Sequence, residues 1–147
     1  DAAGALAALD AMPAATGKRP ALLLRARAAV DLHHAAGGTG AATDGLRRVT
    51  ESLQTWLADH PQDATAWEAL AGTSQALGLD LRSMRAGAEA RAAVGDLNGA
   101  IDRLRAAQAV SRKDGGQDFI EASVIDTRLR QLVAQRRQIA LEARNGN

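Results

Sequence analysis

Apolar residues recur at intervals of three and four along most of the chain, which is the spacing of one face of an α-helix. The pattern is clearest in stripes over 46–57 and 100–107. A longer stripe covers 122–139 and is interrupted by Arg136, which we expect at its edge with the guanidinium reaching water. No segment alternates apolar and polar residues as a half-buried strand does. The pattern therefore predicts an entirely helical chain.

Proline, glycine and aspartate divide this pattern into short helices. The His60–Pro61 step ends one helix, because the residue before a proline is pushed out of the helical region. Asp63 is placed as an N-cap, and Asp118 followed by Glu121 resembles a capping box. The expected organisation is a single domain over 1–144, with a partial helix at 1–12 stopped by Pro13, helical pairs at 20–60, 64–94 and 97–142, a glycine-rich loop inserted at 37–43, and a tail at 145–147.

Short helices with short turns, each with an apolar stripe too narrow to be stable alone, are typical of stacked helical repeats. The tetratricopeptide unit of about 34 residues fits in two frames. In the first, Pro61 ends one unit and Trp67 lies in the first (A) helix of the next. In the second, displaced by half a unit, Met84 and Ala88 lie in an A helix. We favour the first frame, because the proline-to-tryptophan junction is the more specific match, but the register stays open. The expected fold is all-α, with tetratricopeptide-like helical hairpins stacked as a short right-handed α-solenoid with a long C-terminal helix.

A solenoid of this kind has a concave surface that can hold an extended or helical peptide. The candidate binding residues are therefore the exposed polar side chains of the A helices. Under the first frame these include Glu68 and Gln75. Under the second frame they include Arg82, Arg85 and Glu89.

Composition narrows the classes of partner. The 147 residues are 46% hydrophobic but only 2% aromatic, which suits close-packed alanine-rich helices better than a β-sandwich. Lysine and arginine number 18 against 17 acids, and this balance predicts no nucleic-acid partner. No apolar run approaches the ~18 residues of a membrane span, so we expect no direct membrane insertion. The chain has no cysteine, which excludes disulfides and thiolate metal sites.

The candidate chemistry gives no catalytic residue, no cofactor site and no metal site. His33 and His34 are adjacent, so on a helix they point about 100° apart and cannot chelate one ion as an i, i+4 pair would. We interpret them and His60 as solvent-exposed or helix-end histidines. The glycines at 37–40 lack the Lys-Ser/Thr that follows in a phosphate loop. The arginine-rich last helix is interpreted as a solvated or domain-docking face.

The segment from Glu89 to Leu104 (EARAAVGDLNGAIDRL) and the following helix, with Arg128-Leu129-Arg130, carry a closer similarity. They resemble the C-terminal part of the BepA-type periplasmic zinc metalloproteases, in which a catalytic HExxH domain precedes a C-terminal tetratricopeptide domain. The similarity covers residues 20–138 and is best after residue 61. The metal ligands of that family belong to the protease domain, so none is assigned to this chain.

The resemblance implies a non-catalytic protein-binding module in the periplasm. Its parent would be a zinc metalloendopeptidase that acts on outer-membrane proteins and their assembly machinery, and its partner a polypeptide or the parent's own protease domain. Two alternatives stay open, namely a structural module that docks on and gates that protease domain, and a free-standing adaptor. Because the chain opens at Asp1 with a helical pattern already running at Ala2, we expect a piece of a longer protein.

Overall fold

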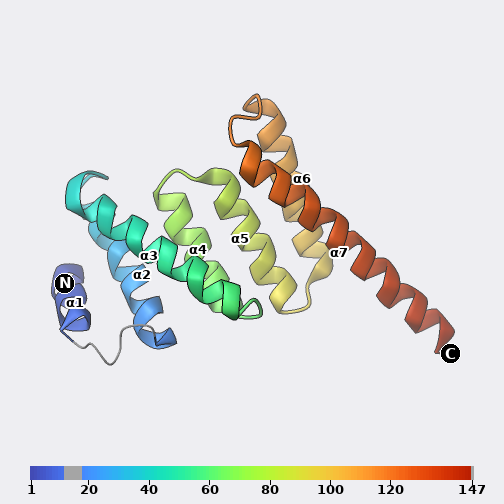
Figure 1. Cartoon of the computed structure of the whole chain (residues 1–147), viewed down its shortest axis with the longest axis horizontal. Coiled ribbons are helices and arrows are strands. Elements are labelled where there is room, and N and C mark those ends of the chain that lie inside the picture. The colour runs from blue at the N-terminus through green and yellow to red at the C-terminus, as the bar shows by residue number, and fades with distance from the viewer. Residues whose placement is uncertain (12–17, 147) are drawn as a thin grey trace.

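The chain folds into a row of α-helices, shown as a computed structural model in Figure 1. The structure describes residues 1–11 and 18–146. Within these residues no strand is found, so the prediction of an all-α stack of helical hairpins with a long C-terminal helix is confirmed. Residues 12 and 13, where the first helix was expected to end, lie outside the described residues. The helices are α1 (Ala2–Asp10), α2 (Arg19–Ala35), α3 (Gly40–Asp59), α4 (Ala64–Ala76), α5 (Asp80–Ala93), α6 (Leu97–Lys113) and α7 (Phe119–Asn145).

Aspartate side chains cap four of these helices, and at α1 the carboxylate of Asp1 accepts a hydrogen bond from the N–H of Ala3 at 3.1 Å. The carboxylates of Asp63, Asp96 and Asp118 each accept a hydrogen bond from the backbone N–H three residues later, at 3.1, 2.9 and 3.0 Å. Each bond satisfies one of the N–H groups that a helix leaves without a partner in its first turn. The predicted N-cap at Asp63 is therefore confirmed.

The glycine-rich loop is shorter than predicted. α2 ends at Ala35 and α3 already begins at Gly40, so the loop covers 36–39 and the expectation of a loop at 37–43 is wrong at its end. Gly37 and Gly38 have φ angles of 65° and 75°, which only glycine adopts without strain. The residues after the glycines include Ala41 and Ala42, good helix formers that extend α3 toward its N-terminus.

The core consists of two apolar clusters that share α5. The first lies among α2, α3 and α4 and receives Ala86 from α5. The second consists of residues of α6 and α7 together with Leu81 and Ala88 of α5. Ala86 and Ala88 are two positions apart, so they point about 200° apart on the helix, and both are fully buried. α5 is therefore packed on two sides, and small side chains let its neighbours approach closely.

Each helix packs mainly on its neighbours in sequence, as in a linear stack. Direct contact between alternate helices joins α2 to α4 and, more lightly, α5 to α7. α7 is the last helix of the row, and Figure 1 shows its C-terminal part extending beyond the other helices. Arg136 lies half-buried at the edge of the α7 stripe, as expected, with Nη1 3.0 Å from Oδ1 of Asn98.

Candidate functional site

A groove runs across one side of the stack and is formed by two adjoining cavities. One, of about 750 Å³, lies among α4, α5 and α6, and the other, of about 520 Å³, lies between α2 and α4. Both are lined by Glu68 and Gly72 of α4, so the two cavities adjoin at these residues. We call the combined feature the α4 groove. Its principal lining residues are Leu23, Val30 and His34 of α2, Glu68, Gly72 and Gln75 of α4, Ser83, Met84 and Gly87 of α5, and Arg103 and Val110 of α6.

The floor of the α4 groove is made of small residues. A Cβ built on Gly72 would meet no other atom within 4 Å, so this glycine opens onto free space at the centre of the groove. Ala71 and Ala90 lie beside it in the larger cavity. Gly87 has a different role, because a Cβ there would lie 2.7 Å from Nη1 of Arg103. The glycine therefore allows the Arg103 guanidinium to lie against the backbone of α5.

Three charged side chains of the groove are unpaired within the described part of the chain. Glu68, Asp80 and Arg103 line the larger cavity and make no ion pair or side-chain hydrogen bond to a described residue. Arg91, in contrast, binds Asp96 at 2.8 Å. The groove thus offers carboxylates and a guanidinium to a ligand that carries charges of both signs.

The hydroxyl group in the larger cavity belongs to Ser83, and it is already engaged. Its Oγ donates a hydrogen bond to the backbone carbonyl of Ala71 at 2.9 Å. A serine nucleophile needs a neighbouring base that accepts this proton, and a carbonyl oxygen cannot take that role. The arrangement therefore favours binding over covalent catalysis at this residue.

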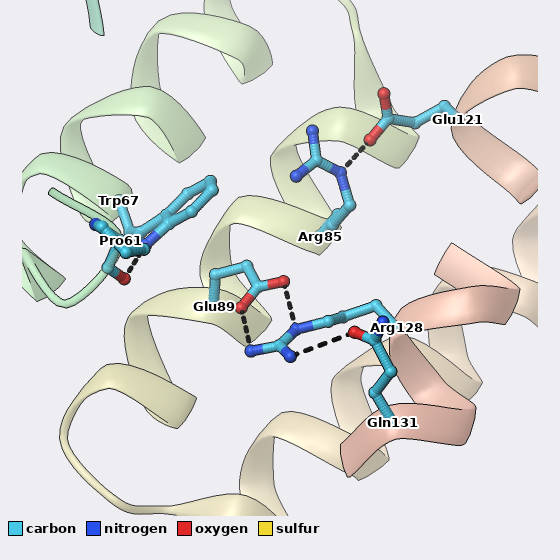
Figure 2. Close-up of polar contacts among 7 residues, drawn as sticks. All are labelled: Pro61, Trp67, Arg85, Glu89, Glu121, Arg128 and Gln131. Carbon is cyan, nitrogen blue, oxygen red and sulfur yellow. Dashed lines mark hydrogen bonds and ion pairs between the residues drawn. The ribbon is translucent and has the colours of Figure 1, made fainter. Parts of the chain in front are cut away.

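The five sequence-predicted binding residues separate into two groups. Glu68 and Gln75 lie together in the α4 groove. Arg85 and Glu89 instead point from α5 toward α7, where they bind the chain itself (Figure 2). Arg82 lies in the same cluster, beside Glu121 of α7.

Ion pairs join α5 to α7 beside the second apolar cluster. Arg85 binds Glu121, whose other carboxylate oxygen lies 3.6 Å from Nε of Arg82. Arg128 holds Glu89 with two hydrogen bonds, of 2.7 and 2.9 Å, in the parallel geometry that suits a guanidinium and a carboxylate. The second set of predicted residues therefore fixes α7 on α5.

The capping box predicted for Asp118 and Glu121 is only half formed. The N–H of Glu121 binds Asp118, but its carboxylate pairs with Arg85 and Arg82 instead of returning to the start of α7. The Glu121 side chain is 6% exposed, so two guanidinium groups compensate a nearly buried negative charge. The Arg85 guanidinium also lies 5.9 Å from the ring centre of Trp67 in α4. This contact links α4 to the cluster between α5 and α7.

Asp63 joins α2, α3 and α4. Besides capping α4, its carboxylate accepts hydrogen bonds from Nε and Nη2 of Arg19, at 2.6 and 2.9 Å, and from the indole nitrogen of Trp56 at 3.0 Å. The bonds from Arg19 foremost, and then those from Trp56 and the Ala66 N–H, hold the pKa of Asp63 well below its usual range. Both tryptophans are half-buried against the first core cluster, as the apolar stripes predicted.

A further cavity, of about 770 Å³, lies on α1, α2 and α3. The rings of Trp56 and His60 stack in its wall, with centroids 3.8 Å apart and an interplanar angle of 7°. This cavity has no residue in common with the α4 groove. It therefore provides a separate surface for a control variant when ligand binding to the α4 groove is tested.

The histidines lie at helix ends, as interpreted from the sequence, but one of them is buried. His33, in the last turn of α2, is 7% exposed and has Nδ1 3.2 Å from Oγ1 of Thr43. His34 and His60 are exposed. Among residues 1–11 and 18–146, no three His, Cys, Asp or Glu side chains are grouped so as to hold a metal ion.

Several groove residues were not predicted. Arg103 lies on α6, which neither frame treated as a source of binding side chains. Asp80 lies in the first turn of α5, before the residues that the second frame named, and the position of Gly72 depends on the packing of its neighbouring helices. The sequence did contain one signal for Gly72, because a glycine inside a helix costs about 1 kcal/mol relative to alanine and its presence needs a reason.

None of the helices in the described ranges combines the length and apolar character needed to cross a membrane. Comparison of the chain with protein-family models, with curated proteins and with solved structures finds no match.

Proposed function

We propose that this chain is a non-catalytic protein–protein interaction domain of the tetratricopeptide type, which binds a polypeptide in the α4 groove. The observation that carries the proposal is the groove itself. It extends over α2, α4, α5 and α6 as two adjoining cavities, and where they meet it is open above Gly72. Its unpaired charges are available to a ligand.

The size and chemistry of the groove favour a polypeptide over a small molecule. Packed helices lie about 8–10 Å apart, so a groove that crosses from α2 over α4 and α5 to α6 spans up to about 30 Å, which accommodates about six to nine residues of extended chain. The lining mixes apolar residues, such as Met84 and Val110, with the charges of Glu68 and Arg103. A peptide with side chains of both kinds would bury the apolar part and pair with both charges. Affinity in the micromolar range, about 8 kcal/mol, is expected from so few anchors.

The resemblance of residues 89–104 to the periplasmic zinc metalloproteases supports a finer proposal. The domain would be the substrate- or partner-binding accessory part of such a protease in outer-membrane protein quality control, and would act in the periplasm. The nearly neutral charge of the chain supports a polypeptide rather than a nucleic acid as its ligand. In a second proposal, the arginine-rich face of α7 docks on the protease domain of the parent, while the α5–α7 ion pairs hold this helix in place.

The test uses a phage-displayed library of random 12-residue peptides, selected on the wild-type chain. Selected peptides are synthesised with a fluorophore, and their binding is measured by fluorescence anisotropy. Gly72→Trp fills the centre of the groove and is expected to weaken binding at least tenfold. Gly72→Ala adds a methyl group in open space and should bind like the wild type.

Gly45→Trp is the matched control, because Gly45 is also a helical glycine and lines the cavity on α1–α3. Circular dichroism of each variant checks the fold. Equal affinity of wild type and Gly72→Trp, or loss of binding in Gly45→Trp alone, would place the ligand outside the α4 groove and refute the proposal.

A further inference from the structure

Arginine and acidic side chains line the α4 groove in two groups, one paired within the chain and one free for a ligand. Arg27 binds Asp31 at 3.3 Å, and Arg91 binds Asp96 at 2.8 Å, so the charges of these residues are already balanced. The second group makes no ion pair or side-chain hydrogen bond to a described residue, and its members are all exposed: Glu68, Asp80 and Arg103.

Glu68 and Arg103 lie at the same level of the stack. The hydrogen bond from Ser83 Oγ to the carbonyl of Ala71 places these two residues level with each other on the antiparallel helices α4 and α5. One turn further along each helix, Glu68 of α4 comes level with Gly87 of α5. Gly87 in turn lies against the guanidinium of Arg103 on α6. A line drawn across α4, α5 and α6 therefore passes Glu68, Gly87 and Arg103 in that order.

The carboxylate of Glu68 and the guanidinium of Arg103 face one cavity without binding each other. The helix between them presents Gly87, which has no side chain, so the space between the two charges stays open. A compact cavity of about 750 Å³ is about 11 Å across, the length of about three residues of extended chain. A basic side chain beside Glu68 and an acidic side chain beside Arg103 would thus lie about three positions apart in the ligand.

The smaller cavity adds an apolar subsite on the α2 side of Glu68. Its floor includes the buried Ala26 of α2 and the half-buried Ala69 of α4. Leu23 and Val30 are also half-buried and lie about one turn before and after Ala26, on the same side of α2. Small residues below and larger apolar residues on two sides leave a space that suits an apolar side chain of the ligand.

Asp80, the other free carboxylate, lies away from this line. It is seven residues from Gly87, which is two turns or about 10 Å along α5. It therefore lines the end of the larger cavity, and a chain that crosses the stack at the level of Glu68 does not bring its basic residue to Asp80.

We propose that the α4 groove selects polypeptide segments by the order of three side chains, read from α2 to α6. An apolar side chain lies against Ala26, a basic one beside Glu68, and an acidic one beside Arg103. This inference rests on the proposed function, in which a polypeptide binds in the groove. Backbone groups within a helix are bonded inside that helix, so the groove reads side chains and accepts either chain direction. A segment with its two charges exchanged places like charges together and is rejected.

Selection from the library of random 12-residue peptides tests the order directly. Peptides selected on the wild-type chain should share a basic and an acidic residue about three positions apart, with an apolar residue beyond the basic one. Glu68→Lys should select an acidic residue in place of the basic one, and Arg103→Glu a basic residue in place of the acidic one. Glu51→Lys and Arg105→Glu make the same changes of charge at exposed positions outside the groove, and they should select the wild-type pattern.

Fluorescence anisotropy with one peptide selected on the wild-type chain measures the size of the effect. Its affinity for Glu68→Lys should fall about tenfold, because an attraction is replaced by a repulsion. The same peptide with its basic residue exchanged for glutamate should recover that loss on Glu68→Lys. Asp80→Asn should change the affinity of the original peptide less than twofold. Circular dichroism checks the fold of each variant.

The outcomes separate this inference from the proposed function. If Gly72→Trp abolishes binding but Glu68→Lys and Arg103→Glu select the wild-type pattern, the order of charges is overturned and the groove remains a peptide site. If binding survives in Gly72→Trp, the proposed function is overturned as well. An equal loss in Asp80→Asn and Glu68→Lys would overturn the path across α4, α5 and α6.

Discussion

Replacement of Asp63 should destabilise the chain more than replacement of the other N-cap aspartates, because its half-buried carboxylate holds three helices together. In Asp63→Ala the N-cap of α4 is lost, which costs about 1 kcal/mol. The indole N–H of Trp56 loses a charged acceptor, at about 1.5–3 kcal/mol, and the exposed guanidinium of Arg19 loses its partner as well. A loss of about 3–4 kcal/mol is expected, which lowers Tm by roughly 10 °C in a domain of this size.

Asp63→Asn separates these contributions. Asparagine is as good an N-cap as aspartate, so the start of α4 is kept, while Trp56 and Arg19 lose their charged acceptor and can bond only to a neutral amide oxygen. Its cost should be about 1–2 kcal/mol. Urea unfolding followed by tryptophan fluorescence measures both variants, and Trp56 reports directly on the site. A cost below about 0.5 kcal/mol for Asp63→Ala would refute the account of Asp63 as the link between α2, α3 and α4.

The same comparison has a defined dependence on pH. Because the folded-state pKa of Asp63 is lowered, its contribution to stability is fully present above the unfolded-state pKa of about 3.9 and is lost as the pH falls toward the folded-state value. The stability difference between wild type and Asp63→Asn should therefore be constant from about pH 5 to pH 7 and shrink below about pH 4. A difference that grows on acidification would contradict the direction of the shift.

Two other perturbations test the packing. Gly72 and Gly78 both have open space where a Cβ would lie, but Gly78 has a φ of 71°. In thermal unfolding, Gly72→Ala should therefore stabilise the chain by about 0.5–1 kcal/mol, whereas Gly78→Ala should destabilise it by about 1 kcal/mol or more. Stability changes of the same sign in the two variants would contradict this account of the two glycines. Glu121→Gln leaves the Arg85 guanidinium without its anion in a mostly buried site and should cost about 3 kcal/mol in urea unfolding, and a double variant with Arg85→Met should recover part of that loss. Simple addition of the two single losses would show that the pair does not interact.

The helices were predictable because their signals are local. The stripes at 46–57 and 100–107 fall within α3 and α6, and Asp63 caps the helix that it precedes. These features depend on residues within one or two turns, so the sequence contains all the information that they need.

The partners of the polar side chains were not predictable. Glu121 has the spacing of a capping-box glutamate, but it binds Arg85, 36 positions earlier in the chain. Spacing alone cannot show which distant guanidinium reaches a carboxylate. The repeat register stayed open for a related reason, since Ala86 and Ala88 bury opposite sides of α5 and each helix therefore contacts both neighbours.

The central claim is that a polypeptide binds in the α4 groove, and amide chemical shifts in an NMR titration test it most directly. A 12-residue peptide selected on the wild-type chain would be added to ¹⁵N-labelled protein, and the perturbed amides mapped on the helices. The account predicts that the largest changes lie around Glu68, Gly72 and Gln75 and extend to α2 and to Arg103 of α6. Changes confined to the cavity on α1–α3, or to α7, would contradict it.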